Sequence, residues 1–574
     1  MKQNNRLNKN KMFSDRLIWL QIIFLSLVGL FITYLFIIQV IDFPHHYRIK
    51  ARNQRKAHSF VMRGNIYDRN GIKLVTDTVY YDIFARRDDF VHTPEELAKM
   101  LAPILKISQV NLTQKLKQNV PLISIKKNVD RRTRDQIAKL NLREIPMDKK
   151  GIRTYPQGTL AAHVLGYYNF DADEASGVEY TAKDKLECSN AGVNLETTPQ
   201  GKIIYNITTD PVAATKPVKG QDITLTIDAA VQHVCEKALM NAIQKFNAYR
   251  GAVIVMNPKN GEILAYAVYP YFDPNNYKAA TNFQRKNWTL TDVFPPGSTF
   301  KTITVASAME LGKINKYSKI NDTGKIKVGW WTIKNYDYNK HPNPGMIDLV
   351  YLFEHSSNVG SVLVAQMMNK HEYYNILRKF GFGERTGIDL PGESVGILKS
   401  PSRWDSSDHA SMGYGYGSSV TAIQMVSAVS AIANNGVRVT PHVIKYSPEE
   451  EAIKIKRVQV MTPEHARAVT ELLTESINRS RSPIKSDTYN IAAKTGTSRK
   501  PKDNGAGYTN KLYTSIVGYM PSSDPQVLIY VIVDSATGYE IWGNTVAAPI
   551  FKEISTQVAR ILNLQPDKYT VNKR

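Results

Sequence analysis

The sequence predicts a membrane-anchored protein of α+β class, with α/β character, in three parts: an N-terminal transmembrane helix, a mixed α+β pedestal domain and a larger C-terminal domain. Three observations predict this organisation. Residues 17–41 form an uncharged apolar stretch. Short strand patterns alternate with helix patterns in the segment that follows. In the C-terminal part, strand patterns at both ends enclose a mainly helical middle, which is typical of an antiparallel sheet flanked by helices plus a helical subdomain.

Length and composition fit several folded domains. The chain has 574 residues, of which 43% are hydrophobic, and this suits three or four units of about 150 residues. The net charge of +23 could suggest nucleic acid, but the basic residues are spread along the chain. No zinc-finger, RNA-recognition or helix-turn-helix pattern occurs. We therefore expect no nucleic-acid partner, and a basic surface that faces anionic cell-wall polymers or lipid headgroups.

The apolar stretch 17–41 is long enough to span a hydrocarbon core of about 30 Å. The segment before this stretch contains one acidic residue, Asp15, and five basic residues: Lys2, Arg6, Lys9, Lys11 and Arg16. Residues 1–16 should therefore stay cytoplasmic as a basic tail. A cleaved signal peptide would have a shorter apolar region ending in small residues, and residues 40–44 offer no such site. We expect a single-pass membrane anchor, with the rest of the chain outside.

Cysteine is scarce, since only Cys188 and Cys235 occur. Two cysteines do not define a disulfide framework, so a disulfide and two isolated thiols both remain open. No Cys/His spacing resembles a metal site. The sequence predicts neither a metal nor a cofactor.

A basic membrane-proximal neck, 42–56, leads to a predicted non-catalytic pedestal domain, 57–210. Residues 63–71 predict a strand followed by a turn. Further patterns predict strands at 79–85 and 122–126 and helices at 94–105 and 132–140. His163 is a lone histidine in an apolar run, which is more often a packed residue than a ligand. The pedestal contains no constellation of catalytic residues.

A polar linker, 211–221, precedes the second domain, 222–565, and a polar tail, 566–574, follows it. Helices are predicted at 229–246, 463–478 and 548–562. Strands are predicted at 222–228, 491–497, 513–519 and 526–534, with a hairpin formed by 251–257 and 261–268.

Ser298 follows the breaker cluster 295–297 and precedes an apolar helix pattern, 302–311, that Gly312 closes. Ser298 should lie at the helix N-terminus, where the helix dipole favours a developing negative charge. Lys301 lies three residues on, on the same helix face. A serine hydroxyl needs an adjacent base to act as a nucleophile at neutral pH, and a desolvated lysine amine can be that base.

The Ser-x-x-Lys pattern is weak by itself, because it occurs twice more. Ser124 and Lys127 lie in an alternating strand pattern, which would place them on opposite faces. Ser482 and Lys485 lie in a polar segment broken by Pro483. Only Ser298 has the turn-then-helix setting that the chemistry requires.

Two further motifs follow Ser298, namely Ser356-Ser357-Asn358 and Lys494-Thr495-Gly496-Thr497. A Ser-x-Asn pattern also occurs at 476–478, where it predicts only a helix end. The Lys-Thr-Gly pattern occurs once, on a predicted strand, and Gly496 would let another backbone approach closely. The ordered set Ser-x-x-Lys, Ser-x-Asn, Lys-Thr-Gly resembles that of the penicillin-binding proteins and serine β-lactamases.

Other segments resemble class B penicillin-binding proteins, so the similarity extends from about residue 63 to residue 554. These segments are 63–71, 153–163, 386–393 and 413–417. Residues 543–551 resemble the division-type (septal) branch more than the elongation-type branch, which remains the alternative. The departures are small: Ser357 fills the free middle position of the second motif, and Ser498 stands where many relatives have alanine.

The resemblance implies a D,D-transpeptidase that cross-links peptidoglycan stem peptides. It implies that Ser298 attacks the D-Ala-D-Ala carbonyl, that Lys301 takes the Ser298 proton and that Ser356 relays a proton to the leaving amine. Substrate would be held by Asn358, Lys494, Thr495, Gly496, Thr497, Tyr414 and Gly415. The backbone N–H groups of Ser298 and Thr497 would form the oxyanion hole.

The implied partners are stem peptides on lipid-linked precursors or nascent glycan strands, β-lactam antibiotics, the membrane, divisome proteins and an integral-membrane glycosyltransferase. A serine β-lactamase would be a smaller, soluble enzyme. A class A bifunctional protein would carry a Glu-Asp-x-x-Phe-x-x-His element, and none occurs between the anchor and Thr226. A scaffold or β-lactam sensor without turnover would be expected to have a damaged motif, and all three motifs are intact.

Overall fold

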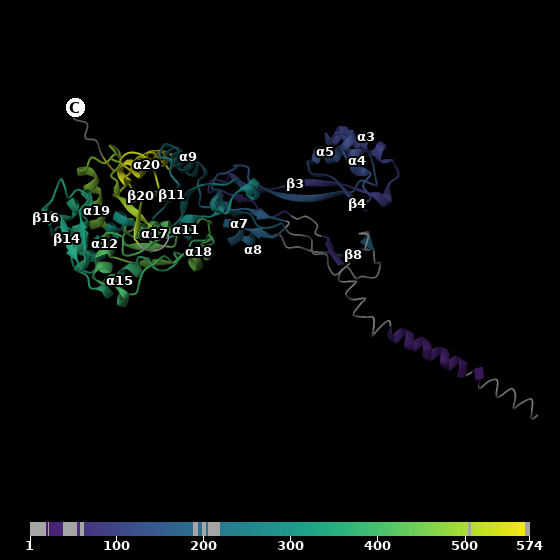
Figure 1. Cartoon of the computed structure of the whole chain (residues 1–574), viewed down its shortest axis with the longest axis horizontal. Helices are drawn as coiled ribbons and strands as arrows, with labels where there is room; N and C mark the ends of the chain where they lie inside the picture. The colour runs from purple at the N-terminus through teal and green to yellow at the C-terminus, as the bar shows by residue number, and fades with distance from the viewer. Residues whose placement is uncertain are drawn as a thin grey trace, which may run out of the picture. The chain divides into compact units, whose positions relative to one another are not determined.

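The computed structural model describes residues 19–20, 22–37, 54–57, 62–170, 172–187, 193–197, 203–204, 219–502 and 507–568 (Figure 1). The chain divides into two compact units, each assembled from separate segments. Unit 1 comprises residues 1–61, 80–150 and 188–218, and unit 2 comprises residues 62–79, 151–187 and 219–574.

The N-terminal apolar stretch is helical over residues 22–37, and its large side chains are exposed. Leu17, Ile18 and residues 38–41 of the predicted span lie outside the described residues. Among the helices that are described, none has both the length and the apolar character that a membrane crossing requires. Cys188 also lies outside the described residues, whereas Cys235 is a buried free thiol.

Within the described residues 80–150, unit 1 has three α-helices and the antiparallel pairing of β4 (Leu122–Val129) with the second half of β3 (Lys73–Arg86). The helices are α3 (Pro94–Leu105), α4 (Gln109–Leu116) and α5 (Arg131–Ala138). A small sheet joins β1 (Gln54–Ala57), β8 (Val193–Thr197) and β9 (Ile203–Ile204).

The helix predicted at 94–105 is confirmed, and its sequence explains its start. Thr93 and Glu96 form a capping box in which each side chain accepts the other's backbone N–H. Leu97, Leu101 and Leu105 share one buried face and pack with Ile83 and Ile123. The helix α4 and the strand β5 (Met147–Thr154) were not predicted.

Unit 2 begins with short elements around β2 (Ile66–Tyr67), which pairs parallel with β10 (Ile223–Thr224) and antiparallel with β3. β10 is shorter than the strand predicted at 222–228. Small elements follow: α6 (Ala162–Leu165), β6 (Tyr168–Asn169), β7 (Glu174–Ala175), α7 (Gly177–Thr181) and α8 (Lys183–Leu186). His163 is buried, and its Nε2 lies 2.8 Å from the backbone oxygen of Gln284, so the prediction of a packed histidine is confirmed.

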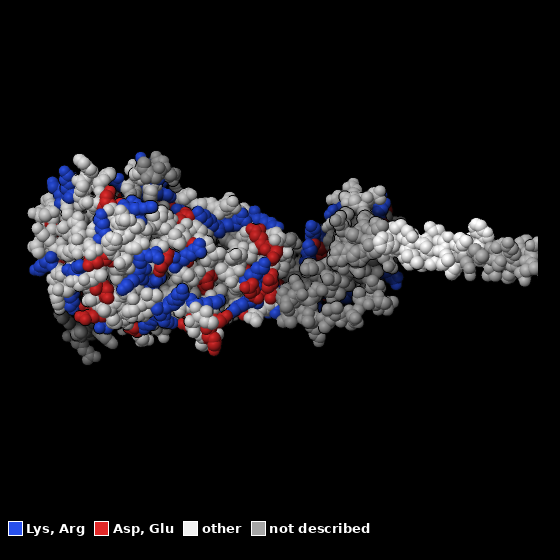
Figure 2. Space-filling model, turned by 90° about the horizontal axis from the view of Figure 1, so that it is seen from below, with Lys and Arg blue, Asp and Glu red and all other residues white. Residues whose placement is uncertain are grey.

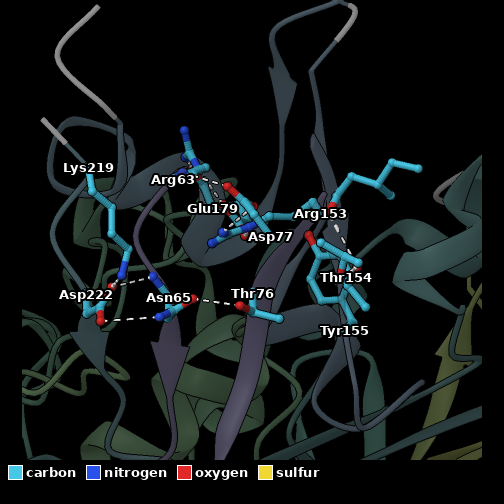
Figure 3. Close-up of polar contacts among 12 residues, drawn as sticks. Arg63, Asn65, Thr76, Asp77, Arg153, Thr154, Tyr155, Glu179, Lys219 and Asp222 are labelled. Atoms are coloured by element: carbon cyan, nitrogen blue, oxygen red, sulfur yellow. Dashed lines mark hydrogen bonds and ion pairs between the residues drawn. The ribbon is translucent and has the colours of Figure 1, made fainter. Parts of the chain in front are cut away.

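A buried ionic network holds four separate segments of unit 2 together (Figure 3). Arg63 Nε and Arg153 Nε donate to the two carboxylate oxygens of Glu179 at 2.9 and 2.6 Å. Arg153 Nη1 donates to Asp77 Oδ1 at 2.9 Å, and the backbone N–H of Arg63 donates to Asp77 Oδ2 at 2.6 Å. Two cations and two carboxylates therefore balance within the protein interior.

A five-stranded antiparallel sheet forms the centre of unit 2, in the order β12-β11-β21-β20-β19 (Figure 1). Its strands are β11 (Arg250–Met256), β12 (Ile263–Tyr269), β19 (Ala492–Pro501), β20 (Tyr508–Met520) and β21 (Val527–Asp534). Alternate residues point to opposite faces, so Ile254 and Val253 belong to different hydrophobic clusters. The predicted antiparallel sheet is confirmed.

Helices cover both faces of this sheet. α9 (Ala229–Lys245) and α20 (Ala548–Ile561) pack in one cluster with Val253, and α17 (Ala422–Ala433) packs in the other with Ile254. The helical subdomain contains α12 (Lys301–Glu310), α13 (Leu349–Glu354), α14 (Asn358–Gln366), α15 (Lys370–Lys379), α16 (Ser406–Met412), α18 (Pro448–Lys454) and α19 (Pro463–Arg479). The short helices α10 (Asn282–Arg285) and α11 (Trp288–Thr291) precede it.

Three small strand pairs within the helical subdomain were not predicted. They are β13 (Lys319–Asp322) with β16 (Gly345–Asp348), β14 (Lys325–Val328) with β15 (Trp331–Lys334), and β17 (Val437–Val439) with β18 (Arg457–Gln459). These strands are three or four residues long and largely polar, so they carry too little periodicity to be recognised from sequence.

Candidate active site

Ser298 lies on a tight turn that runs directly into a helix. Residues Gly297–Phe300 form a 3₁₀ turn, and α12 starts at Lys301. Ser298 is therefore one turn before the α-helix, whereas the sequence placed it at the helix start. Gly297 has φ +58°, and its N–H donates to the oxygen of Gly415 at 3.0 Å. A Cβ on Gly415 would lie 2.2 Å from the Gly297 oxygen, so only glycine fits behind the serine turn.

Lys301 is fully buried and points at the second motif. Its Nζ donates to Ser356 O at 2.5 Å, to Ser356 Oγ at 3.1 Å and to Asn358 Oδ1 at 2.7 Å. The Ser298 hydroxyl makes no hydrogen bond to Lys301 within the described residues. Hydrogen bonds of catalytic groups are often longer without substrate and shorten in the reacting complex.

The environment of Lys301 favours the neutral amine. Burial, followed by the charge of Lys494, holds the pKa of Lys301 well below its usual value, while the carboxylates of Asp322 and Asp337 oppose this shift. A neutral amine in a dry site can accept a proton from a hydroxyl at neutral pH. Lys301 therefore has the chemistry of a general base.

Ser356 and Asn358 are positioned by the turn that enters α14. Ser356 has φ +50°, an uncommon conformation for a residue with a side chain. Ser357, which the sequence treats as filling a free position, is buried. Its hydroxyl accepts the N–H of Gly360 and donates to Asp322 Oδ2 at 2.5 Å. The middle residue of this motif is therefore a helix cap.

Asn335 and Lys334 complete the orientation of Asn358. Asn335 Oδ1 accepts the N–H groups of Asn358 and Val359 at 2.8 and 3.0 Å, and its amide donates to Asp322. Asn358 Nδ2 donates to Lys334 O at 2.9 Å, which leaves Oδ1 facing Lys301. Sequence reasoning missed Asp322, which ends the short strand β13, and Asn335, which follows β15, because both lie upstream of the motif in segments without a periodic pattern.

The third motif lies on the edge strand β19. Lys494 is buried, its Nζ donates to Thr495 O at 3.0 Å, and burial lowers its pKa to about 7. A Cβ on Gly496 would lie 2.7 Å from Ser515 Oγ and 2.9 Å from a methyl carbon of Thr299. Gly496 therefore permits a close approach, but its two nearest neighbours are side chains, whereas the sequence predicted a backbone; the nearest backbone atom, Thr299 N, would lie 3.3 Å away. Thr497 Oγ1 accepts the N–H of Gly543 at 3.0 Å.

The three motifs open onto one cleft of about 1750 Å³. Its lining includes the predicted residues Ser298, Ser356, Asn358, Lys494, Thr495, Gly496, Thr497 and Tyr414. Gly415 lies behind the serine turn, as described above. Burial raises the pKa of Tyr414 to about 12, so its phenol stays neutral. Aromatic side chains extend the cleft, namely Trp331, Tyr336, Tyr416, Tyr508 and Trp542.

Ser498 ties the third motif to the turn that carries Ser298. Its side chain is buried, and the hydroxyl donates to the oxygen of Pro295 at 2.7 Å. Ser498 therefore adds a hydrogen bond between β19 and the segment that precedes Ser298.

One cluster at the cleft was not predicted. Asp337, His341 and His355 bring their polar side-chain atoms within 4.8 Å of one another, and all three line the cleft. The sequence analysis expected no metal because no Cys/His spacing resembled a metal site. This cluster escaped that search because it combines Asp337 and His341, four residues apart, with His355 from a later segment.

Comparison with known proteins agrees with this geometry. The model described as "Penicillin binding protein transpeptidase domain" matches residues 251–556, and the model described as "Penicillin-binding Protein dimerisation domain" matches residues 58–225.

Similar proteins extend over most of the chain. Stage V sporulation protein D of Bacillus subtilis is 32% identical over 528 residues, covering 89% of this chain and 80% of that protein. A probable peptidoglycan D,D-transpeptidase PenA of Neisseria gonorrhoeae is 29% identical, covering 88% of this chain and 85% of that protein. The crystal structure of penicillin-binding protein 2X from Streptococcus thermophilus has a TM-score of 0.73 at 24% identity, covering 89% of this chain and 82% of that chain. The chain therefore belongs to the class B penicillin-binding proteins, whose transpeptidase domain is of the serine D-Ala-D-Ala type.

Proposed function

We propose that this protein cross-links peptidoglycan stem peptides through an acyl-enzyme on Ser298. The observation that carries the proposal is the fully buried Lys301, whose amine contacts the second motif and whose pKa is lowered by burial and by Lys494. The sequence places this base three residues after a serine that lines a large cleft. Nucleophile, base and substrate-binding strand then belong to one site.

In the proposed reaction, Lys301 takes the Ser298 proton as the hydroxyl oxygen attacks the carbonyl between the two terminal D-alanines. The N–H groups of Ser298 and Thr497 stabilise the oxyanion, and losing one such donor typically costs about 10²–10³ in rate. Ser356, hydrogen-bonded to Lys301, passes a proton to the departing D-alanine amine. An amine of a neighbouring stem then attacks the ester, and Ser298 regains its proton.

The other predicted residues hold the donor stem. Asn358 offers its amide to the peptide backbone, and Lys494, Thr495, Gly496 and Thr497 bind the terminal carboxylate. Tyr414 lines the cleft, and Gly415 supports the turn that carries Ser298 from behind. β-Lactams, which acylate the same serine, are the expected inhibitors.

We place the protein in the bacterial cytoplasmic membrane, with residues 17–41 as the anchor and the catalytic domain outside. The pedestal, 57–210, and the transpeptidase domain, 222–565, are the proposed functional divisions. A septal role is favoured because residues 543–551 resemble the division-type branch, and a relative from Mesostigma viride, 29% identical over 593 residues, is named a peptidoglycan D,D-transpeptidase FtsI homolog. An elongation role is the alternative.

The proposed partners are nascent or lipid-linked glycan strands, divisome proteins and an integral-membrane glycosyltransferase. Nucleic acid is not among them. On the face of unit 2 seen in Figure 2, lysines and arginines are interspersed with acidic side chains and form no continuous basic track. A surface of mixed charge suits contact with other proteins better than contact with a polyanionic duplex.

Fluorescent-penicillin labelling of the full-length chain in detergent tests the proposal. We expect stoichiometric, hydroxylamine-sensitive labelling that is lost in Ser298→Ala and in Lys301→Ala. The matched controls are Ser124→Ala and Lys127→Ala, the same pattern placed on β4 of unit 1, and these should label normally. Labelling that persists in Ser298→Ala would place the nucleophile elsewhere.

A further inference from the structure

A cluster of two imidazoles and one carboxylate lies at the rim of the cleft and has no role in the proposed reaction. Candidate ligand atoms of Asp337, His341 and His355 all lie within 4.8 Å of one another. His355 Nδ1 is 3.3 Å from Asp337 Oδ2. The rings of His341 and His355 meet edge to face, with centroids 5.6 Å apart.

Local structure brings the three side chains together. The backbone N–H groups of Lys340 and His341 both donate to the oxygen of Asp337, at 2.8 and 2.9 Å. This turn places His341 beside Asp337. His355 follows the end of α13, where its ring stacks on Tyr351 at 4.0 Å. The cluster thus joins the loop after β15 to the segment that precedes Ser356.

The surroundings favour a cation. The Asp337 side chain is only 9% exposed, so its charge is poorly solvated. The nearby cations Lys334 and Lys340 are exposed, so solvent screens their opposing charge.

We propose that Asp337, His341 and His355 bind one divalent transition metal ion. The combination of two imidazoles and one carboxylate indicates Zn²⁺. Two imidazoles and a carboxylate are the ligands of open, four-coordinate zinc sites, in which water fills the remaining position. In a tetrahedral site with metal–ligand bonds of about 2.0–2.2 Å, the ligand atoms lie about 3.3–3.6 Å apart. His355 Nδ1 and Asp337 Oδ2 already have a separation of 3.3 Å. Rotation of the exposed His341 side chain brings the third donor to the same spacing.

The metal would fix Ser356. The loop before Asp337 already holds Asn358, through Asn335 and the oxygen of Lys334. A metal on His355 would tie the same loop to the residue before Ser356, so both sides of the motif would be held. His341, Asp337 and His355 are therefore positioning residues for Ser356, which itself has an uncommon φ of +50°.

The test uses the full-length chain in detergent, stripped with chelator and then titrated with ZnCl₂ or CoCl₂. We expect one equivalent of Zn²⁺ by calorimetry and, for Co²⁺, intense visible absorption typical of a four-coordinate site. His341→Ala and Asp337→Asn should each weaken Zn²⁺ binding at least about tenfold. The matched control is His371→Ala, an exposed histidine on α15, and it should bind like the parent.

No stoichiometric binding by the parent chain would overturn the proposal, as would equal binding in the parent, His341→Ala and Asp337→Asn. A second readout is the rate of penicillin acylation, which rests on the proposed function and should fall when metal is removed from the parent but not from His341→Ala. Metal binding is measured without turnover. If the proposed reaction failed, the binding result would therefore be unaffected, and the two failures could be told apart.

Discussion

Two of the places where unit 2 buries positive charge treat that charge in opposite ways. Outside the cleft, Arg63 and Arg153 are paired with Asp77 and Glu179 at 2.6–2.9 Å. In the cleft, Lys301 and Lys494 are buried without a carboxylate in hydrogen-bond contact. Nearly all described partners of these two lysines are carbonyl or hydroxyl oxygens.

The paired arginines have a structural role, whereas the unpaired lysines of the cleft are suited to chemistry. Burial alone would lower the pKa of Arg153, but the charges of Glu179 and Asp77 reverse this and raise it. Burial lowers the pKa of Lys494 to about 7, and burial together with the Lys494 charge lowers that of Lys301. Paired cations stay charged and hold segments together, whereas the unpaired amine of Lys301 favours its neutral form and becomes available for proton transfer.

The largest expected effect is on catalysis. Lys301→Met should lower the rate of β-lactam acylation about 10²–10⁴-fold, because the general base is lost. Its melting temperature should not fall, because the substitution removes a poorly solvated amine and keeps the volume. Stopped-flow acylation and a thermal unfolding curve of the same sample check both halves. A large loss of stability would mean that the Lys301 amine has a structural role, which would contradict the distinction between the arginines of the ionic network and the lysines of the cleft.

The ionic network should show the reverse behaviour. Glu179→Gln leaves two buried arginines with one carboxylate, so the free energy of unfolding should fall by about 3–5 kcal/mol. The matched control is Glu471→Gln, whose partner Lys316 is 3.2 Å away in an exposed pair and whose loss should cost at most about 1 kcal/mol. Urea unfolding of the full-length chain measures both, and similar losses would contradict the distinction.

The third prediction concerns pH. The folded pKa of Lys494, about 7, lies below the ordinary value of 10.5, so the unfolded chain binds more protons between these values. The contribution of Lys494 to stability is therefore fully present above about pH 10.5 and is lost as the pH falls through about 7. Lys494→Met should flatten the rise of unfolding free energy over this window. An unchanged pH dependence would show that Lys494 stays charged when folded.

The smallest effect is expected at Ser498. Ser498→Ala removes one buried hydrogen bond to the oxygen of Pro295, which should cost about 0.5–1.5 kcal/mol. Acylation should change less than about tenfold, because the N–H groups of the oxyanion hole remain. Parallel unfolding and acylation measurements test this, and a catalytic loss comparable to Lys301→Met would give Ser498 a direct role.

Much of the site could be predicted because it depends on local sequence. Local sequence marks the turn at Pro295–Gly297 and the apolar helix that follows it, and so places the first motif where the two meet. The Lys-Thr-Gly motif likewise lies on a strand that can be recognised from its own sequence. Antiparallel pairing of β11 with β12 followed from two apolar runs separated by a short turn. These features need no knowledge of tertiary contacts.

The rest could not be predicted, because it depends on contacts between distant segments. Asn335 reaches the N–H of Asn358 only once β13–β16 have folded around α14. Ser357 looked like a free position because its cap to Gly360 and its bond to Asp322 exist only in the folded turn. The cluster around His355 likewise depends on the turn at Asp337. Such polar contacts leave no periodicity in the sequence.

The most direct test of the central claim is the pH dependence of Ser298 acylation by a fluorescent penicillin, with the full-length chain in detergent. If Lys301 acts as a neutral base, the second-order rate constant should rise with pH and level off well below pH 10.5, because the amine is already deprotonated there. A rate constant that keeps rising tenfold per pH unit up to about pH 10 would show an ordinary lysine, and would contradict the account of a base made reactive by burial.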